Sequence, residues 1–189
     1  MKRSVFVLAF ALLTSPAVAQ DVTPKMRAYF ETEISTWSNN PVLVDAIRAQ
    51  NAKTQGYSQS QIDEMDLEWR AQIGTADSSI IGPVLNNDAS EFLRSVVNDA
   101  GGVITEVFAM DARGLNVAAS DVTSDYWQGD EAKFTETYPN GAGAVHFGEI
   151  EFDDSSQSYQ GQISFTVVDP NTSEVVGAMT VGVNAEVFF

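Results

Sequence analysis

The spacing of apolar residues changes near Val103 from the period of a helix to the period of a strand. This change constrains the fold of the 189-residue chain more than any other feature. Before it, apolar residues recur three or four positions apart, at Met26, Phe30, Ile34 and Trp37. After it, apolar and polar residues alternate in short runs that turn residues separate. Helices followed by strands predict an α+β fold.

Residues 20–101 form the predicted helical part of the chain, and residues 102–189 form the predicted sheet part. The predicted helices run over 23–38, from Pro41 to about Thr54, from Ser58 or Ser60 past Trp69, and over 88–98. The predicted strands are 104–110, 115–119, 145–152, 162–168 and 175–183, with a short helical stretch at 130–138. We therefore predict one domain, residues 20–189, in which N-terminal helices pack on a five-stranded antiparallel sheet with the last strand near its centre.

Residues 1–19 have the pattern of a secretory signal peptide. The basic pair Lys2-Arg3 precedes an apolar run over 5–13, and Ala17-Val18-Ala19 matches a cleavage site. A helix of that apolar length rises about 15 Å, half of the roughly 30 Å hydrocarbon core of a membrane. We expect cleavage after Ala19 and a periplasmic location.

Charge and cysteine content exclude several kinds of partner and site. The chain has 26 Asp and Glu against 10 Lys and Arg, and its formal net charge is -16 at pH 7. Such an acidic surface repels phosphates, so we expect no nucleic-acid partner. No Cys and one His exclude disulfides, thiolate metal sites and multi-histidine sites. We expect neither a metal nor another cofactor.

Several segments together carry a family resemblance. They are 104–111, 114–117 and 121–131, the helical positions Asn40-Pro41, Ala46-Ile47, Gln50-Asn51 and Trp69, and the strand positions Ile163-Ser164 and 176–178. In these segments the chain resembles the bacterial single Cache (PDC) sensor family, whose domains have an extracellular PAS-like fold. The resemblance covers nearly the whole mature chain. It implies a first helix along one face of the sheet, and a small-molecule pocket between the other face and the segment after the second strand.

The resemblance also carries expectations about signalling partners. A receptor of this family would continue from its last strand into a transmembrane helix, whereas this sequence stops at Phe189. We therefore expect a stand-alone form whose signal passes to a membrane sensor kinase, chemoreceptor or transporter. Domains of this family often pair through the N-terminal helix, so a homodimer is a further possible partner state.

The segment 121–131 is the predicted pocket wall. It contains two aromatic residues and four carboxylates beside Gly129. Aromatic rings attract cations and carboxylates accept hydrogen bonds from ammonium groups, which favours an amine or amino-acid ligand. The predicted contacts here are Trp127, Tyr126, Asp125, Asp121 and Asp130. Alternatively, the acidic residues are turn and cap residues and Trp127 covers the core.

Three further candidate contacts lie outside the segment 121–131. Ser164 can donate a hydroxyl from the polar face of its strand, although a solvated polar stripe explains it equally well. Lys133 can pair with a ligand carboxylate or with Asp130. His146 is either a ligand contact or a structural histidine, because a bulge at Gly148 would make its direction ambiguous.

The preferred function is a periplasmic small-molecule-binding domain of the sensor type, without a transmembrane or output module of its own. The alternative is a ligand-free interaction module that docks a membrane receptor or transporter through its helical face. A hydrolase using Asp125 and Asp130 is a third class, but no nucleophile elbow, phosphate loop or metal motif supports it. We therefore expect no enzyme.

Overall fold

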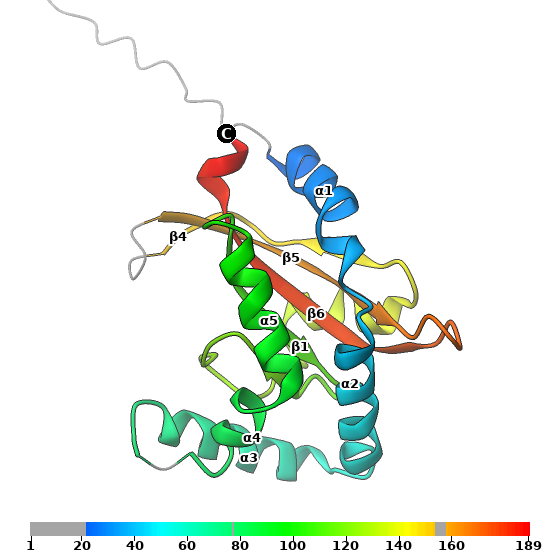
Figure 1. Cartoon of the computed structure of the whole chain (residues 1–189). Coiled ribbons are helices and arrows are strands. Elements are labelled where there is room, and N and C mark those ends of the chain that lie inside the picture. The colour runs from blue at the N-terminus through cyan, green and yellow to red at the C-terminus, as the bar shows by residue number, and fades with distance from the viewer. Residues whose placement is uncertain (1–21, 77, 154–157) are drawn as a thin grey trace, which may run out of the picture.

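The computed structural model describes residues 22–76, 78–153 and 158–189 (Figure 1). The predicted signal peptide lies outside these residues. The helices are α1 (Thr23–Thr32), α2 (Pro41–Thr54), α3 (Gln59–Gln72), α4 (Ile81–Leu85), α5 (Asp88–Asp99) and α6 (Ala132–Thr135), and the 3-10 turns are η1 (Ile34–Thr36), η2 (Tyr138–Asn140) and η3 (Ala185–Phe188). No helix within the described ranges is long and apolar enough to cross a membrane.

The strands form one antiparallel sheet. They are β1 (Ile104–Met110), β2 (Asn116–Ala119), β3 (Val145–Phe147), β4 (Glu151–Asp153), β5 (Ser158–Val168) and β6 (Val175–Asn184). Their order is β2-β1-β6-β5-β3, and β4 pairs with the other end of β5. The α+β class and the central position of the last strand are thereby confirmed.

The sheet has six strands where the sequence predicts five, because the predicted strand 145–152 is broken. Phe147 pairs with Ile163, so an unbroken ladder would pair residue 150 with Gln160. Instead Glu151 pairs with Gln160, which leaves one extra residue in the segment 148–150. A single extra residue is a β-bulge, which bends a strand and interrupts its ladder.

The first helix is shorter than predicted. α1 ends at Thr32, and the chain continues as the 3-10 turn η1. Two hydroxyl groups near this break bind backbone oxygens one turn back, Thr32 to Ala28 at 3.0 Å and Ser35 to Glu31 at 2.7 Å. Such bonds compete with the regular helical ladder and weaken helix interiors. The polar run after Glu31 therefore ends the helix.

The predicted starts of α2 and α3 agree with their caps. Asn40 accepts a hydrogen bond from the backbone nitrogen of Val42 at 3.0 Å, and Pro41 occupies the first turn of α2. Ser58 and Gln61 form a reciprocal capping box at the start of α3. Caps of this kind satisfy the free N–H groups of a helix N-terminus. The short helix α4 was not predicted from the sequence.

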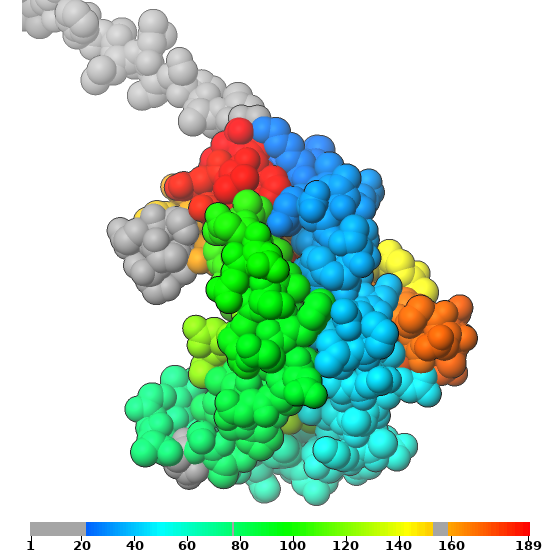
Figure 2. All heavy atoms as spheres, viewed as in Figure 1, coloured from blue at the N-terminus to red at the C-terminus, as the bar shows by residue number. Residues whose placement is uncertain are grey.

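Helices α1, α2 and α5 cover one face of the sheet, which we call the helical face. Figure 2 shows α5 beside the continuous column of α1 and α2. Buried residues of the helices, including Met26, Ile47 and Leu93, share a core with Phe165 and Val181 of the sheet. This packing is the arrangement that the helical period predicts.

Helices α3 and α4 lie at the end of the molecule opposite to α1 and η3 (Figure 1). Trp69 of α3 is fully buried, and its indole nitrogen donates to the backbone oxygen of Thr123 at 2.9 Å. Trp69 belongs to a second apolar cluster with Phe108, Leu115 and Phe134. This cluster connects α3 to the edge of the sheet and to the segment that follows β2.

Candidate functional site

The second face of the sheet, which we call the open face, carries mostly polar side chains. Phe108, Thr180, Ser164 and His146 are cross-strand neighbours on β1, β6, β5 and β3. The adjacent row places Gly182 between Glu106 and Gln162. Because side chains alternate along a strand, both rows point away from the helical face.

The centre of the open face is closed. The hydroxyl oxygens of Ser164 and Thr180 lie 3.0 Å apart, and both residues are fully buried. One hydroxyl donates to the other, so each buried hydroxyl has a hydrogen-bond partner. Beside them, the ammonium of Lys133 on α6 lies 5.4 Å from the centre of the Phe108 ring, a cation–π contact that holds α6 against the sheet.

A hollow of about 860 Å³ opens beside α6, and we call it the α6 hollow. The charged and polar side chains on its walls include Glu131, Lys133, His146, Glu149, Glu151 and Gln162. Lys133 forms an ion pair with Glu131 at 3.0 Å and donates to the Gln128 amide oxygen at 3.1 Å. Among the described residues, neither Glu149 nor Glu151 forms an ion pair. With His146 counted as neutral, the lining therefore has a net negative charge.

Two predicted contact residues, Lys133 and His146, therefore meet at the α6 hollow. Ser164 lies next to His146 in the sheet, but it is buried beneath the surface of the hollow. His146 pairs with Ser164 in the ladder before the bulge at residues 148–150. Its side chain therefore points to the open face, as that of Ser164 does. Ligand contact by these three residues stays a prediction.

Tyr126 and Trp127 lie outside this hollow. Tyr126 is buried, and its ring stacks on Trp69 at 5.3 Å between centroids. Burial, and then the negative charge of Asp111, raises the pKa of the Tyr126 hydroxyl far above its ordinary value. The indole nitrogen of the half-buried Trp127 donates to the backbone oxygen of Arg113 at 2.9 Å. Both rings thus have structural partners.

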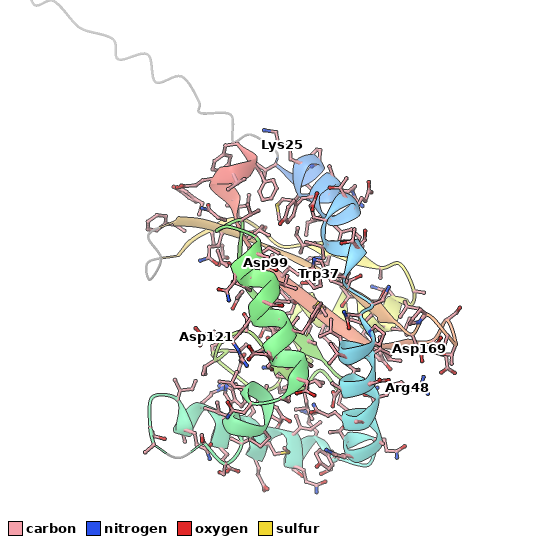
Figure 3. All side chains as sticks on the ribbon, viewed as in Figure 1. Lys25, Trp37, Arg48, Asp99, Asp121 and Asp169 are labelled. Carbon is pink, nitrogen blue, oxygen red and sulfur yellow. The ribbon has the colours of Figure 1, made fainter. Side chains whose placement is uncertain are left out.

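The three acidic residues of segment 121–131 that were predicted to contact a ligand do not line the α6 hollow. Asp121 is exposed (Figure 3), and its carboxylate accepts from the backbone nitrogen of Val122 at 2.6 Å. The Asp125 carboxylate accepts from the Gln128 amide. Asp130 is exposed. Ligand contact by these residues also stays a prediction.

Other residues of the α6 hollow were not predicted as contacts. Gln162 shares the polar face of β5 with Ser164, so the alternation along the strand was a usable signal. Glu149 lies within the bulge segment and Glu151 directly follows it, and the sequence gives no signal for their direction because the extra residue shifts the register there. Within the described residues, no group of three His, Asp or Glu side chains could hold a metal ion.

Comparisons with known proteins give similarity in structure alone. No family model matches the chain, and no curated protein matches its sequence. Among solved structures, the chain is similar to the sensor domain of the histidine kinase DctB from V. cholerae, with a TM-score of 0.48 and 14% identity. That alignment covers 88% of this chain and 53% of the other.

Two chemoreceptor domains are also similar. The ligand-binding domain of Campylobacter jejuni Tlp3, in complex with 4-methylisoleucine, has a TM-score of 0.42 and 11% identity, over 85% of this chain and 64% of the other. The ligand-binding domain of the amino acid chemoreceptor PctC of Pseudomonas aeruginosa PAO1, in complex with GABA, has a TM-score of 0.42 and 12% identity, over 86% and 62%. This chain thus spans less than two thirds of each of these structures. The first is the sensor domain of a kinase, and the other two are ligand-binding domains of chemoreceptors.

Proposed function

We propose that the chain is a periplasmic ligand-binding domain of the sensor type, that its ligand is a small molecule with an ammonium group, and that it signals through a membrane partner. An amino acid is the favoured ligand. The observation that carries the proposal is the α6 hollow, an acidic cavity on the polar face of the sheet. It lies on the side where the resemblance to Cache domains implies a pocket.

The lining suits both ends of an amino acid. The carboxylates of Glu149 and Glu151 would accept hydrogen bonds from the ammonium group, because charge-assisted hydrogen bonds are the strong ones. Lys133 would receive the ligand carboxylate in exchange for Glu131, its present ion-pair partner. Phe152, which is 48% exposed, supplies an apolar surface for a side chain.

The size of the cavity agrees with a small ligand. Sites for small molecules occupy about 300 to 1,000 Å³, and the α6 hollow has about 860 Å³. His146 and Gln162 supply imidazole and amide groups at its floor, so polar groups of different ligands could be told apart.

The test is a thermal-shift screen of residues 20–189 against amino acids, amines and carboxylates, followed by calorimetric titration of any compound that stabilises the domain. A ligand at 100 times its dissociation constant should add about 2.7 kcal/mol to the free energy of unfolding. Glu149→Gln and Gln162→Leu should weaken binding of that compound. The matched control is Glu136→Gln, because Glu136 is exposed at the end of α6 and does not line the hollow.

The ligand-free interaction module makes the opposite prediction, that no compound of the panel stabilises the domain. An exposed apolar patch on the first two helices would favour this alternative, because such a patch could dock a partner. Among the described residues, the large exposed apolar side chains lie elsewhere: Leu67, Ile73, Val122, Phe152, Tyr159, Val187 and Phe189. Ligand binding is therefore our conclusion, while pairing through α1 stays a prediction for measurement of the oligomeric state.

A further inference from the structure

A second hollow, which we call the α1–α5 hollow, lies on the helical face between the C-terminal ends of α1 and α5 and has a volume of about 330 Å³. Three aromatic residues line it: Tyr29 from α1, Trp37 directly after η1 and Phe92 from α5. The rings of Trp37 and Phe92 meet edge to face, 6.4 Å apart between their centroids. The hollow shares no lining residue with the α6 hollow, which lies across the sheet. Its volume is at the lower end of the range for small-molecule sites.

The charged groups in the lining of the α1–α5 hollow are two carboxylates. Glu33 directly follows α1 and Asp99 is the last residue of α5, and both are exposed. Figure 3 shows Asp99 beside Trp37, between the two helices. Within the described part of the chain, neither carboxylate forms an ion pair or a hydrogen bond. The hollow is therefore negatively charged and open to a cation.

The cations of α1 and α5 have partners elsewhere. The ammonium group of Lys25 donates to the backbone oxygen of Phe189 at 3.0 Å. The guanidinium group of Arg27 lies 4.7 Å from the centre of the Phe147 ring. Arg94 forms an ion pair within α5 at 2.7 Å. None of these three cations lines the α1–α5 hollow, so the described residues of the two helices do not neutralise it.

The two carboxylates occupy positions that a cation would make favourable. A helix carries a partial negative charge at its C-terminus, where cations are stabilising and anions are not. Glu33 and Asp99 lie at the C-terminal ends of α1 and α5, and neither helix has a basic residue in its last turn. Two carboxylates and two helix C-termini thus converge on one aromatic hollow, and a bound cation would offset the repulsion at both ends.

A guanidinium group fits these walls better than an ammonium group does. It is planar and stacks on aromatic faces, while the N–H groups at its edge donate to carboxylates in pairs. It is also more weakly hydrated than an ammonium group, which lowers the cost of leaving water. Val96, Ala100 and Ile104 supply apolar surface for a short alkyl chain.

We infer that the α1–α5 hollow is a second binding site, for a small guanidinium compound with a short apolar body, in which Glu33 and Asp99 accept hydrogen bonds from the cation and Trp37 stacks on it. This inference goes beyond the proposed function because the hollow lies on the other face of the sheet. It also differs in the ligand, which needs no carboxylate group.

The probe is butylguanidinium, titrated into residues 20–189 by calorimetry, and butylurea is its uncharged match. We expect butylguanidinium to bind and butylurea to bind at least about tenfold more weakly, because the two have similar shapes and differ in charge. Glu33→Gln and Asp99→Asn should each weaken binding of butylguanidinium by about tenfold, since each removes a charge-assisted hydrogen bond.

Thermal unfolding distinguishes a ligand contact from a structural role. Because Glu33 and Asp99 lie at negative helix ends, Glu33→Gln and Asp99→Asn should raise the melting temperature of the ligand-free domain by about 1 to 4 °C. The matched control is Glu31→Gln, since Glu31 is exposed in the last turn of α1 but does not line the hollow. It should raise the melting temperature in the same way and leave binding unchanged.

NMR locates the bound cation. Trp37 lines the α1–α5 hollow, and its indole N–H signal is one of three in the chain, which Trp37→Phe assigns. This signal should shift saturably with the calorimetric dissociation constant of butylguanidinium. The imidazole signal of His146, inside the α6 hollow, should stay unmoved.

The inference is overturned if butylguanidinium does not bind, if it binds no better than butylurea, or if Glu33→Gln and Asp99→Asn bind it as tightly as their control does. Loss of stability together with loss of binding in both variants would make their role structural and would also overturn it. A shift of the His146 signal without a shift of the Trp37 signal would place the cation in the α6 hollow, with the same consequence. None of these results decides whether an amino acid binds, because Glu149→Gln reports that separately.

Discussion

The carboxylate of Asp66 accepts a hydrogen bond from the backbone nitrogen of Tyr126 at 2.9 Å, and the same oxygen accepts from Trp127 at 3.1 Å. Asp66 lies on α3, is 6% exposed and forms an ion pair with Arg70. One buried side chain thus fixes the segment between β2 and α6 to α3. This segment ends at the wall of the α6 hollow.

Removing this connection should destabilise the fold. Asp66→Ala leaves two backbone N–H groups without their acceptor and should lower the free energy of unfolding by about 2 to 4 kcal/mol. The matched control is Asp63→Ala on the exposed side of α3, which should change it by less than about 0.5 kcal/mol. Urea unfolding measures both values, and equal stabilities of the two variants would contradict the role of Asp66.

Gly114 should be far less replaceable than another glycine with a similar backbone. Gly114 has φ +78°, and an added Cβ would come within 2.6 Å of the Gly129 Cα. Gly74 has φ +73° and open space around such an atom. Gly74→Ala should therefore cost only the left-handed strain of about 1 to 2 kcal/mol. Gly114→Ala should cost at least about 1 kcal/mol more in thermal or urea unfolding, because the backbone must also move.

Asp169 should make stability depend on pH in the acid range. It follows β5, and its carboxylate accepts from the backbone nitrogen of Asn171 at 2.8 Å and from Arg48 of α2 (Figure 3). These bonds, the backbone bond first, hold the pKa of Asp169 below its ordinary value, even though burial opposes them. Its contribution is present above the ordinary Asp pKa of about 3.9 and is lost as pH falls through the lowered value.

Asp169→Asn should therefore be less stable than the wild type at pH 7, and the difference should shrink as the pH falls below about 4. Urea unfolding across this range measures the difference. Asp45→Asn, an exposed change on α2, is the control and should show no such trend. A difference between wild type and Asp169→Asn that stays constant with pH would contradict this account.

The sequence was sufficient for elements that depend on local patterns. The cap at Asn40, the capping box that begins at Ser58 and the alternation in β5 are encoded within a few residues. The break at residues 148–150 was not, because one extra residue in a bulge leaves the composition of the strand unchanged. The early end of α1 had a local signal in its hydroxyl side chains, but the apolar spacing outweighed it in the prediction.

The candidate site was harder to predict than the fold. Proximity in the sequence grouped Tyr126, Trp127 and Asp125, but the chain turns Tyr126 toward α3 and Trp127 toward Arg113. The residues that line the α6 hollow come from three separate segments. Asp66 had no signal in the sequence, since its partners lie 60 and 61 residues further along the chain.

The central claim, that an amino acid or a related amine binds in the α6 hollow, can be tested through the single histidine of the chain. His146 lines the hollow, so its imidazole gives one side-chain NMR signal from inside the proposed site. The measurement uses tag-free residues 20–189 and any ammonium compound that calorimetry shows to bind. The account predicts a saturable shift of the His146 signal with the calorimetric dissociation constant. Binding that leaves this signal unmoved, or no binding by any compound of the panel, would contradict it.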